Sequence, residues 1–336
     1  MKIVVDAMGG DYAPAVVAAG AVDAAKEYGH EILLIGDKKL VSAELNKYNS
    51  AGLPISIIHA SEVVEMSDSA AGSLRSKPNS SIAQGIKLLA EKKADGFFSA
   101  GHSGAVGASA LITLKRIKGV SRPAIATVFP TLNAPCVLVD AGVNVDSKPK
   151  NLFQFAVMGS LYSKYIFGIK NPAVGLLSIG KEETKGNELT LETYKLLKNS
   201  DLNFVGNIEG GDIVRGEINV VVCDGFTGNI VLKLGEGVAQ LLISLIKNEM
   251  KKNPIKVMAA YLLLRGVFKN IKKKIDYDEY GGAPLLGVNG VCFIGHGSSN
   301  AKAIKNGIRV TANAVKNNIN GHIEEELKKL GENNGD

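Results

Sequence analysis

The segment Gly295–Asn300 reads GHGSSN, a histidine and two serines set among glycines at the end of an apolar run. Three chemistries fit it: an ordinary tight turn, a serine nucleophile with a histidine base, or a cradle of backbone donors for an anion. Neighbouring side chains at a strand–helix junction usually diverge, and a serine at a helix start is ordinarily a cap. The sequence therefore favours the anion cradle over a pairing of His296 with Ser298 or Ser299.

Further loops of small polar residues also follow apolar, strand-like runs. With Gly295–Asn300 they make five: Asp6–Asp11, Ser99–Gly104, Gly180–Asn187 and Asp224–Asn229 are the others. Small residues let a ligand approach the backbone, and the first turn of a following helix offers free N–H groups and a positive dipole end. One such loop alone is more typical of a plain turn, but five together indicate a phosphate-like ligand.

The usual nucleotide-binding and hydrolase motifs are missing. GxxxxGK[ST] does not occur, and neither SAGHSGA nor GHGSSN completes the GxGxxG of dinucleotide-binding proteins. The run Gly101-His102-Ser103-Gly104 is one residue short of the GxSxG turn of serine hydrolases. A standard nucleotide, nicotinamide or flavin site and a hydrolase nucleophile are therefore disfavoured.

The composition is that of a globular protein with room for one large α/β domain or two smaller ones. The 336 residues are 46% hydrophobic and 21% charged, and the start, MKIVVDAMGG, lacks the apolar core of a signal peptide. Cys136, Cys223 and Cys292 lie in or beside apolar runs without CxxC spacing, which predicts buried, reduced thiols in a cytosolic protein. The five histidines lack zinc-ligand spacing, so no metal site is expected.

Apolar runs alternate with helical patterns along most of the chain, which predicts a mostly parallel sheet covered by helices on both faces. A helix is expected from about Pro14 to Tyr28, with the proline in its first turn. The runs 124–130 and 136–142, joined by Pro130–Pro135, are expected to pair antiparallel. The other expected strands lie near 2–7, 31–37, 55–60, 95–99, 173–180, 203–208, 219–225 and 291–297. We expect a single two-lobed domain over 1–330 and a frayed tail over 331–336.

The segment 237–275 does not fit the sheet, because its pattern is helical, with an interruption at Asn253-Pro254. A helical hairpin projecting from the α/β body is expected here. Its second half carries an apolar stripe at spacings of three and four, at Val257, Tyr261, Leu264, Phe268, Ile271 and Ile275. Positions 247–274 hold nine basic residues and one acid, whereas the rest of the chain has 30 basic and 32 acidic residues. The basic character is therefore local, and no nucleic-acid-binding surface is expected.

Several of these loops belong to longer motifs. In order they are VDAMGGD, SAGHSGA, VLVDAGVNVD, GLLSIGKEETKGNE, FVGNIEGGDI, VVVCDGFTGN and YGGAPLLGVNGV…HGSS. In this order and spacing the chain, from Met1 to about Val315, resembles the bacterial phosphate:acyl-acyl-carrier-protein acyltransferases, the PlsX family. Two segments depart from the family pattern, which more often reads SAGNTGA at 99–105 and LDVGAN at 139–144; both keep small polar chemistry.

The resemblance implies a Rossmann-like three-layer α/β/α fold, related to isopropylmalate dehydrogenase and phosphotransacetylase, in a homodimer without metal or organic cofactor. It implies that inorganic phosphate attacks the thioester of a long-chain acyl-acyl carrier protein and yields acyl phosphate. That product would supply the glycerol-3-phosphate acyltransferase that begins phospholipid synthesis. A cytoplasmic protein in peripheral contact with an anionic membrane, and with this downstream enzyme, is implied as well.

Carried onto this chain, the implied chemistry needs positioning more than an activated serine, because phosphate at neutral pH is already a usable nucleophile. Lys185 would add positive charge, and Asn187 or Asn144 would donate to the thioester oxyanion. His296 would carry a proton between phosphate and the leaving thiolate. The expected phosphate-binding residues are Gly297, Ser298, Ser299, Asn300, Gly101, His102, Ser103, Gly104, Gly9 and Gly10. The carboxylates expected to cap helices or orient these donors are Asp6, Asp11, Asp140 and Asp224.

The hairpin is expected to dimerise through its stems and to touch an anionic bilayer with its tip. The residues expected to make these contacts are Val257, Met258, Tyr261, Leu262, Leu263, Leu264 and Phe268. Alternatively, its lysines attract the acidic carrier protein. Two other functions remain open: a phosphotransacetylase-like enzyme that uses acyl-CoA, and a non-catalytic membrane-docking scaffold, which would leave the five loops unexplained.

Overall fold

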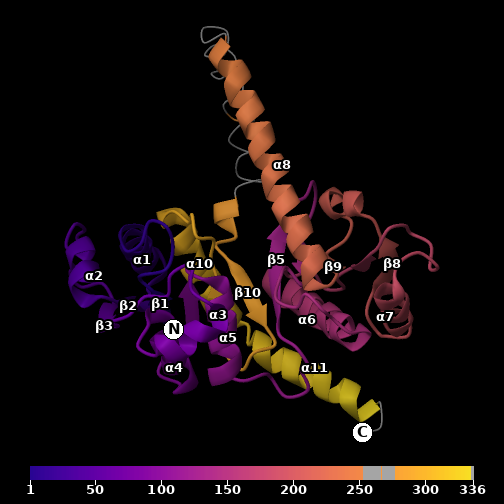
Figure 1. Cartoon of the computed structure of the whole chain (residues 1–336), viewed down its shortest axis with the longest axis horizontal. Helices are drawn as coiled ribbons and strands as arrows, with labels where there is room; N and C mark the ends of the chain where they lie inside the picture. Colours follow the sequence, from indigo (N-terminus) through magenta and orange to yellow (C-terminus); the bar gives the residue numbers. More distant parts are fainter. Residues whose placement is uncertain (253–265, 267–276, 334–336) are drawn as a thin grey trace.

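The computed structural model describes residues 1–252, 266 and 277–333 (Figure 1). Within this part of the chain the frame is one eleven-stranded sheet, in the order β3-β2-β1-β4-β11-β10-β5-β6-β9-β7-β8. The strands are β1 Lys2–Asp6, β2 Glu31–Gly36, β3 Ile55–His59, β4 Gly96–Ser99, β5 Ala124–Phe129, β6 Cys136–Val139, β7 Val174–Leu177, β8 Phe204–Ile208, β9 Val220–Val222, β10 Ala283–Leu286 and β11 Val291–Ile294.

The sheet consists of two parallel groups joined by antiparallel strands. Strands β3, β2, β1, β4 and β11 run parallel to one another, as do β6, β9, β7 and β8. Between them, the pairs β11–β10, β10–β5 and β5–β6 are antiparallel, so the two groups run in opposite senses. The expected mostly parallel sheet and the antiparallel pair of β5 and β6 are confirmed. The short strand β10 was not expected, because it contains a proline and has no flanking periodicity.

Helices cover both faces of the sheet, because successive strand residues point to opposite sides. Ile3 and Val5 pack in one core cluster with α1 and α10, whereas Val4 packs in another with α4 and α5. The expected three-layer α/β/α fold is therefore confirmed. The helices are α1 Ala15–Tyr28, α2 Lys38–Leu45, α3 Ala70–Ser76, α4 Ser81–Ala90, α5 Ser103–Thr113, α6 Pro149–Phe167, α7 Glu188–Lys198, α8 Gly225–Lys252, α10 Ala301–Lys316 and α11 Ile319–Asn333, with short 3-10 helices η1 Gly210–Arg215 and η2 Tyr277–Glu279.

Helix α8 has 28 residues and stands out from the body of the molecule (Figure 1). It begins well before position 237, where the sequence pattern placed the start of the hairpin. Asp224 accepts hydrogen bonds from the Thr227 backbone N–H at 2.9 Å and from its hydroxyl at 2.7 Å, which caps the helix there. The segment expected as a loop after Asp224 is therefore the first turn of α8. The remainder of the hairpin, with its expected membrane and dimer contacts, lies outside the described residues.

The three cysteines are buried and unpaired, as expected. Burial raises the pKa of the Cys136 and Cys292 thiols to about 12, so these side chains act as small apolar groups in the core. At the other end of the chain, α11 continues to Asn333, three residues into the segment expected to fray.

Candidate functional site

The strand topology indicates a ligand crevice in the half of the sheet that contains β1, β4 and β11. The helix after β4, α5, packs on the opposite face from α1 and α10, which follow the neighbouring strands β1 and β11. Where connections diverge to opposite faces, the carboxyl ends of the strands leave a ligand-sized crevice. Hydrogen bonds join the three loops there: Ser99 Oγ donates to Asp6 at 2.7 Å, and the Asp11 N–H donates to the Gly297 carbonyl at 2.8 Å. We call this the N-half crevice.

Asp6 holds the floor of the N-half crevice. It is buried and accepts a hydrogen bond from the Met8 N–H at 3.0 Å. Burial raises the pKa of its carboxyl, although hydrogen bonds from Ser81 and Ser99 act in the opposite direction. A Cβ at Gly9 would lie 2.6 Å from the Gly101 nitrogen, so only glycine lets these two loops approach. The carboxylate therefore links β1 to the loop after β4, and its role in orienting phosphate donors stays a prediction.

Two of the expected phosphate ligands in this crevice already serve as helix caps. His102 Nδ1 accepts from the Ala105 N–H at 3.2 Å, and Nε2 lies 3.1 Å from the Asp68 carbonyl, so its ring nitrogens are both engaged. Asn300 Oδ1 accepts from the Ala303 N–H at 3.0 Å, and Nδ2 donates to Asp278 at 2.6 Å. An anion here would thus depend on backbone N–H groups at the starts of α5 and α10, not on these side chains.

His296 and Ser298 do meet, contrary to the expectation that they diverge. His296 Nδ1 lies 2.8 Å from Ser298 Oγ and accepts from the Ser298 N–H at 3.2 Å. Since Nδ1 accepts that bond, the neutral ring carries its proton on Nε2. A serine nucleophile needs a base that a third group orients, and no hydrogen bond among the described residues reaches Nε2. The pair therefore resembles a closed turn with an exposed proton carrier.

Substituting Ser298 separates these two readings. Ser298→Ala is expected to leave turnover nearly unchanged, whereas His296→Ala is expected to lower it about tenfold or more through loss of proton transfer. Steady-state kinetics of both purified variants would check this, with circular dichroism as the control for folding. Loss of all turnover in Ser298→Ala would make the serine a nucleophile.

The same rule indicates a second crevice between β6 and β9. Their following helices pack on opposite faces, with α6 on the side of the main core cluster and α8 on the other side. Asn144 joins the two loops, since its carbonyl accepts from the Gly225 N–H at 2.8 Å at the start of α8. Two exposed apolar side chains, Val145 at 60% and Phe226 at 58%, flank this connection. We call this the C-half crevice.

Asp140 organises the C-half crevice. The side chain is fully buried and accepts from five N–H groups. The donors are the backbones of Ile125, Gly142, Val143 and Asn144 and the Asn144 side chain. Burial raises the pKa of its carboxyl, although the bonds from Asn144 lower it. Position 228 must be glycine, because an added Cβ would lie 1.9 Å from the Asp140 carbonyl oxygen.

The two asparagines expected as oxyanion donors differ in whether their side-chain amide hydrogens are free to bind a ligand. Asn144 Nδ2 donates to the Pro123 carbonyl at 2.7 Å and to Asp140 at 2.8 Å, so both of its amide hydrogens are used. Its expected role as an oxyanion donor is therefore replaced by a structural one. Asn187 caps α7 through Oδ1, which accepts from the Thr190 N–H at 3.0 Å, and its exposed amide nitrogen points to no protein partner within the described chain.

Lys185 is the candidate cation of the C-half crevice. It lies in the loop after β7, the strand next to β9, and Asn207 Nδ2 fastens this loop through the Glu182 carbonyl at 2.9 Å. The ammonium forms no ion pair with the residues that the structure describes. In the N-half crevice, by contrast, the carboxylate of Asp11 lies 3.4 Å from where a Cβ on Gly297 would stand. The exposed ammonium of Lys185 therefore makes the C-half crevice a candidate place for phosphate.

Sheet twist brings the carboxyl ends of the two parallel groups closer in direction than their order along the ladder implies. From β4 to β9 there are five strand steps, and at about 20–25° of twist per step the accumulated rotation is roughly 100–125°. Strands that are antiparallel along the ladder then differ in direction by only about 55–80°.

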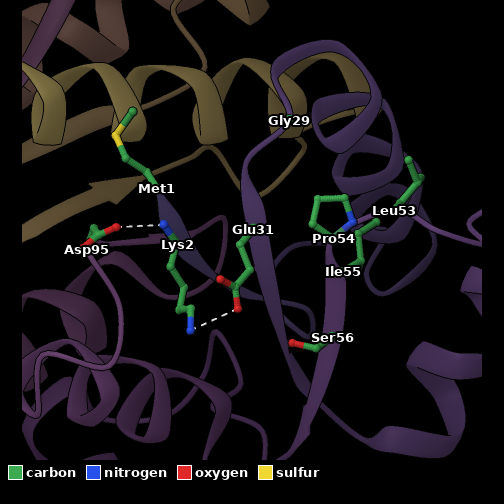
Figure 2. A pocket seen from close by; sticks show the side chains of 9 residues that line it. All are labelled: Met1, Lys2, Gly29, Glu31, Leu53, Pro54, Ile55, Ser56 and Asp95. Atoms are coloured by element: carbon green, nitrogen blue, oxygen red, sulfur yellow. Dashed lines mark hydrogen bonds and ion pairs between the residues drawn. The ribbon is translucent and has the colours of Figure 1, made fainter.

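Two cavities lie away from the crevices. Figure 2 shows one of about 600 Å³ at the amino ends of β1, β2 and β3, where Lys2 pairs with Glu31 at 3.0 Å and its N–H donates to Asp95 at 2.8 Å. Its charges neutralise one another, so it has no evident catalytic chemistry. The other, of about 380 Å³, lies between the halves beside Tyr162 and Arg309.

Comparison with known proteins gives concordant matches. The model of the family described as "Fatty acid synthesis protein" matches residues 1–322. A phosphate acyltransferase of Pelobacter propionicus is 52% identical over 329 residues, covering 98% of this chain and 95% of that protein. One of Geotalea uraniireducens is 51% identical with the same coverage. Among solved structures, a phosphotransacetylase from Streptococcus pyogenes matches with a TM-score of 0.63 at 20% identity over 94% of each chain, a likeness of fold alone.

Proposed function

This chain belongs to the fatty acid synthesis protein family, whose matched relatives are phosphate acyltransferases, and we propose that it makes acyl phosphate from a long-chain acyl-acyl carrier protein and inorganic phosphate. The protein is an acyltransferase of lipid synthesis. The observation that carries the proposed site is the C-half crevice, where a buried carboxylate fixes two loops between the start of α8 and an unpaired lysine.

Phosphate would lie between Lys185 and the first turn of α8. The helix start contributes a positive dipole end, and the Asp224 carboxylate is held at the cap of that helix by two hydrogen bonds from Thr227. The exposed amide of Asn187 lies on the same loop as Lys185 and is the remaining candidate for an oxyanion donor.

The reaction follows from this placement. A phosphate oxygen attacks the thioester carbonyl carbon, the carbonyl oxygen becomes an oxyanion, and the C–S bond then breaks to release the carrier thiolate. The proton of the attacking phosphate passes to that thiolate, and the Nε2 of His296 from the facing crevice is the proposed carrier. The lysine and the backbone donors stabilise charge that develops along this path and need no covalent intermediate.

An acyl-CoA donor and a non-catalytic scaffold are the rival functions. The likeness of fold to phosphotransacetylases motivates the first, and the exposed apolar helix α8 motivates the second. Purified protein with phosphate and either palmitoyl-acyl carrier protein or palmitoyl-CoA separates all three. Acyl phosphate from the carrier-bound donor is the expected product. Formation from the CoA donor alone would favour the phosphotransacetylase-like function, and no product from either would favour the scaffold.

Helix α8 supports the proposal of a homodimer. Leu234, Val238, Leu241 and Leu245 recur at spacings of four, three and four and are 46–65% exposed, so they form one apolar stripe. Such a stripe suits packing against another helix at a shallow angle. By length and composition Gly225–Lys251 could also cross a membrane. Its first turn, however, is fixed to the sheet through Gly225, which favours a packing role for the stem.

A charge placed on this stripe tests the dimer. Leu241→Glu combined with Leu245→Glu is expected to convert the dimer to monomer, because burying two carboxylates against an apolar partner is strongly unfavourable. Analytical ultracentrifugation would measure this. Ala239→Glu with Gln240→Glu, which adds the same two charges at exposed positions away from the stripe, serves as the matched control. A stripe variant that sediments like the wild-type protein would refute this interface.

The proposal for localisation follows from the same helix. A cytoplasmic enzyme with α8 and the basic segment 247–274 directed toward an anionic membrane would deliver acyl phosphate close to the glycerol-3-phosphate acyltransferase that consumes it. Sedimentation with anionic vesicles would test this contact, and its absence would leave the acyl transfer itself unaffected.

A further inference from the structure

A second basic surface borders the C-half crevice on its β5 side, whereas Lys185 lies on its β7 side. Six exposed basic side chains come from the loop before β5, the loop after β6 and the first turn of α6. They are Lys115, Arg116, Lys118, Arg122, Lys148 and Lys150, which we call the basic patch. None of the six forms an ion pair with another described residue.

The positive charge of the basic patch is not cancelled locally. No acidic residue occurs between Asp95 and Asp140, and Asp140 itself is buried, so Asp146 is the one exposed acid on the two loops. The neighbouring helix α11 packs Leu327 close to Gly119. Its four glutamates, at 324–326 and 332, outnumber its two lysines at 328 and 329, one of which pairs with Glu326 at 3.4 Å; this excess of two acids is smaller than the six charges of the basic patch. A net positive surface therefore remains.

The two loops of the basic patch are fixed relative to each other. The Ser121 N–H donates to Gln154 Oε1 at 2.8 Å, and Gln154 Nε2 donates to the Gly119 carbonyl at 2.8 Å. Asn151 Nδ2 donates to Ser121 Oγ at 2.7 Å. The link to the crevice is equally direct, because Asn144 Nδ2 donates to the Pro123 carbonyl at 2.7 Å. The backbone that carries the basic side chains is thus held by hydrogen bonds, and it is linked to the crevice by one of them.

We propose that the basic patch is the docking surface for the acidic acyl carrier protein, and not the lysines of segment 247–274. This inference rests on the proposed function, since it names the place where that donor binds. A thioester carried on a flexible prosthetic arm requires its protein to dock beside the reacting crevice, and the basic patch is contiguous with it. Unpaired lysines and arginines are available to an acidic partner without breaking an internal ion pair.

Exposed apolar side chains complete the surface. Ile112, just before Lys115 in the chain, is 66% exposed, and Val145 is 60% exposed. An apolar centre with a charged rim is the usual composition of a protein–protein interface. An anionic membrane would be attracted by the same charge, but a flat bilayer does not explain why the patch adjoins the crevice through Asn144 and Pro123.

The test compares carrier binding with turnover of a small donor. In Lys118→Glu with Arg122→Glu, the Kd for acyl carrier protein is expected to rise about tenfold or more, with weaker dependence on salt. Turnover of palmitoyl-pantetheine thioester, which lacks the carrier, is expected to stay at the wild-type rate. The control is Lys38→Glu with Lys39→Glu on α2, an equal change of charge at exposed positions.

Unchanged carrier affinity in the patch variant would overturn the docking surface. So would a variant that keeps its affinity for the carrier but no longer sediments with phosphatidylserine vesicles, because the patch would then face lipid. Failure of the proposed function would look different. In that case the wild-type protein would form no acyl phosphate, whereas binding of the carrier would still report on the docking surface.

Discussion

Replacing Lys185 by alanine is expected to lower kcat/KM for phosphate roughly a hundredfold, with the fold intact. The ammonium lies in the loop assigned to the proposed phosphate position and has no competing ion pair among the described residues. It would face an anion whose charge moves toward the thioester oxygen in the transition state. Removal of one preorganised donor of this kind costs about 10²–10³ in rate. Lys185→Arg should restore part of the activity, since the charge returns in a different shape.

The matched control is Lys181→Ala on the same loop. Lys181 is also exposed, but it pairs with Asp212 at 3.1 Å and so should not hold phosphate. Initial rates at varied phosphate would be measured for all three variants, with thermal unfolding as a check on folding. If Lys185→Ala kept the wild-type rate, or if Lys181→Ala were equally impaired, phosphate would have to bind elsewhere, and the N-half crevice would be the next place to test.

Asp140→Asn is expected to lower the free energy of unfolding by about 2–4 kcal/mol. Five N–H groups converge on this buried carboxylate. An amide would present its own N–H groups to some of them and leave buried donors unsatisfied. Because these bonds also hold the start of α8 through Asn144, activity should fall further than stability alone explains.

Chemical denaturation and steady-state rates on the same preparation would measure both effects of this substitution. Asp146→Asn makes the same chemical change six residues on, at an exposed position, and should leave the stability unchanged. Equal stability of Asp140→Asn and the wild-type protein would mean that the carboxyl is protonated in the fold and acts as a donor itself. The proposed organisation of the crevice would then be wrong.

The frame of the molecule was predictable because it depends on local patterns. Near-continuous apolar runs between helical segments identified the strands of the parallel groups, and the proline-rich link between 130 and 135 identified the antiparallel pair β5–β6. The start of α8 was misplaced, because glycines at 225 and 228 look like loop residues in a sequence. In the fold they are required by close contact with Asn144 and Asp140.

The candidate site was predictable as a set of loops but not as a set of free donors. Whether a polar side chain can meet a ligand depends on which partner it already has, and that partner is set by tertiary structure. The side-chain amide of Asn144 donates its two hydrogens to Asp140 and Pro123. Both ring nitrogens of His102 are engaged, with Ala105 and Asp68. Conversely, the turn at 296–298 brings the side chains of His296 and Ser298 together, although the sequence suggested that they would diverge.

The most direct test of direct phosphate attack is the fate of labelled oxygen. Purified protein would be incubated with palmitoyl-acyl carrier protein and phosphate labelled with oxygen-18 at every position, and the product would be identified by mass spectrometry. Attack of phosphate on the thioester predicts palmitoyl phosphate that retains every labelled oxygen, with equimolar free carrier thiol. Release of free palmitate without labelled product, or accumulation of a palmitoylated protein, would contradict it.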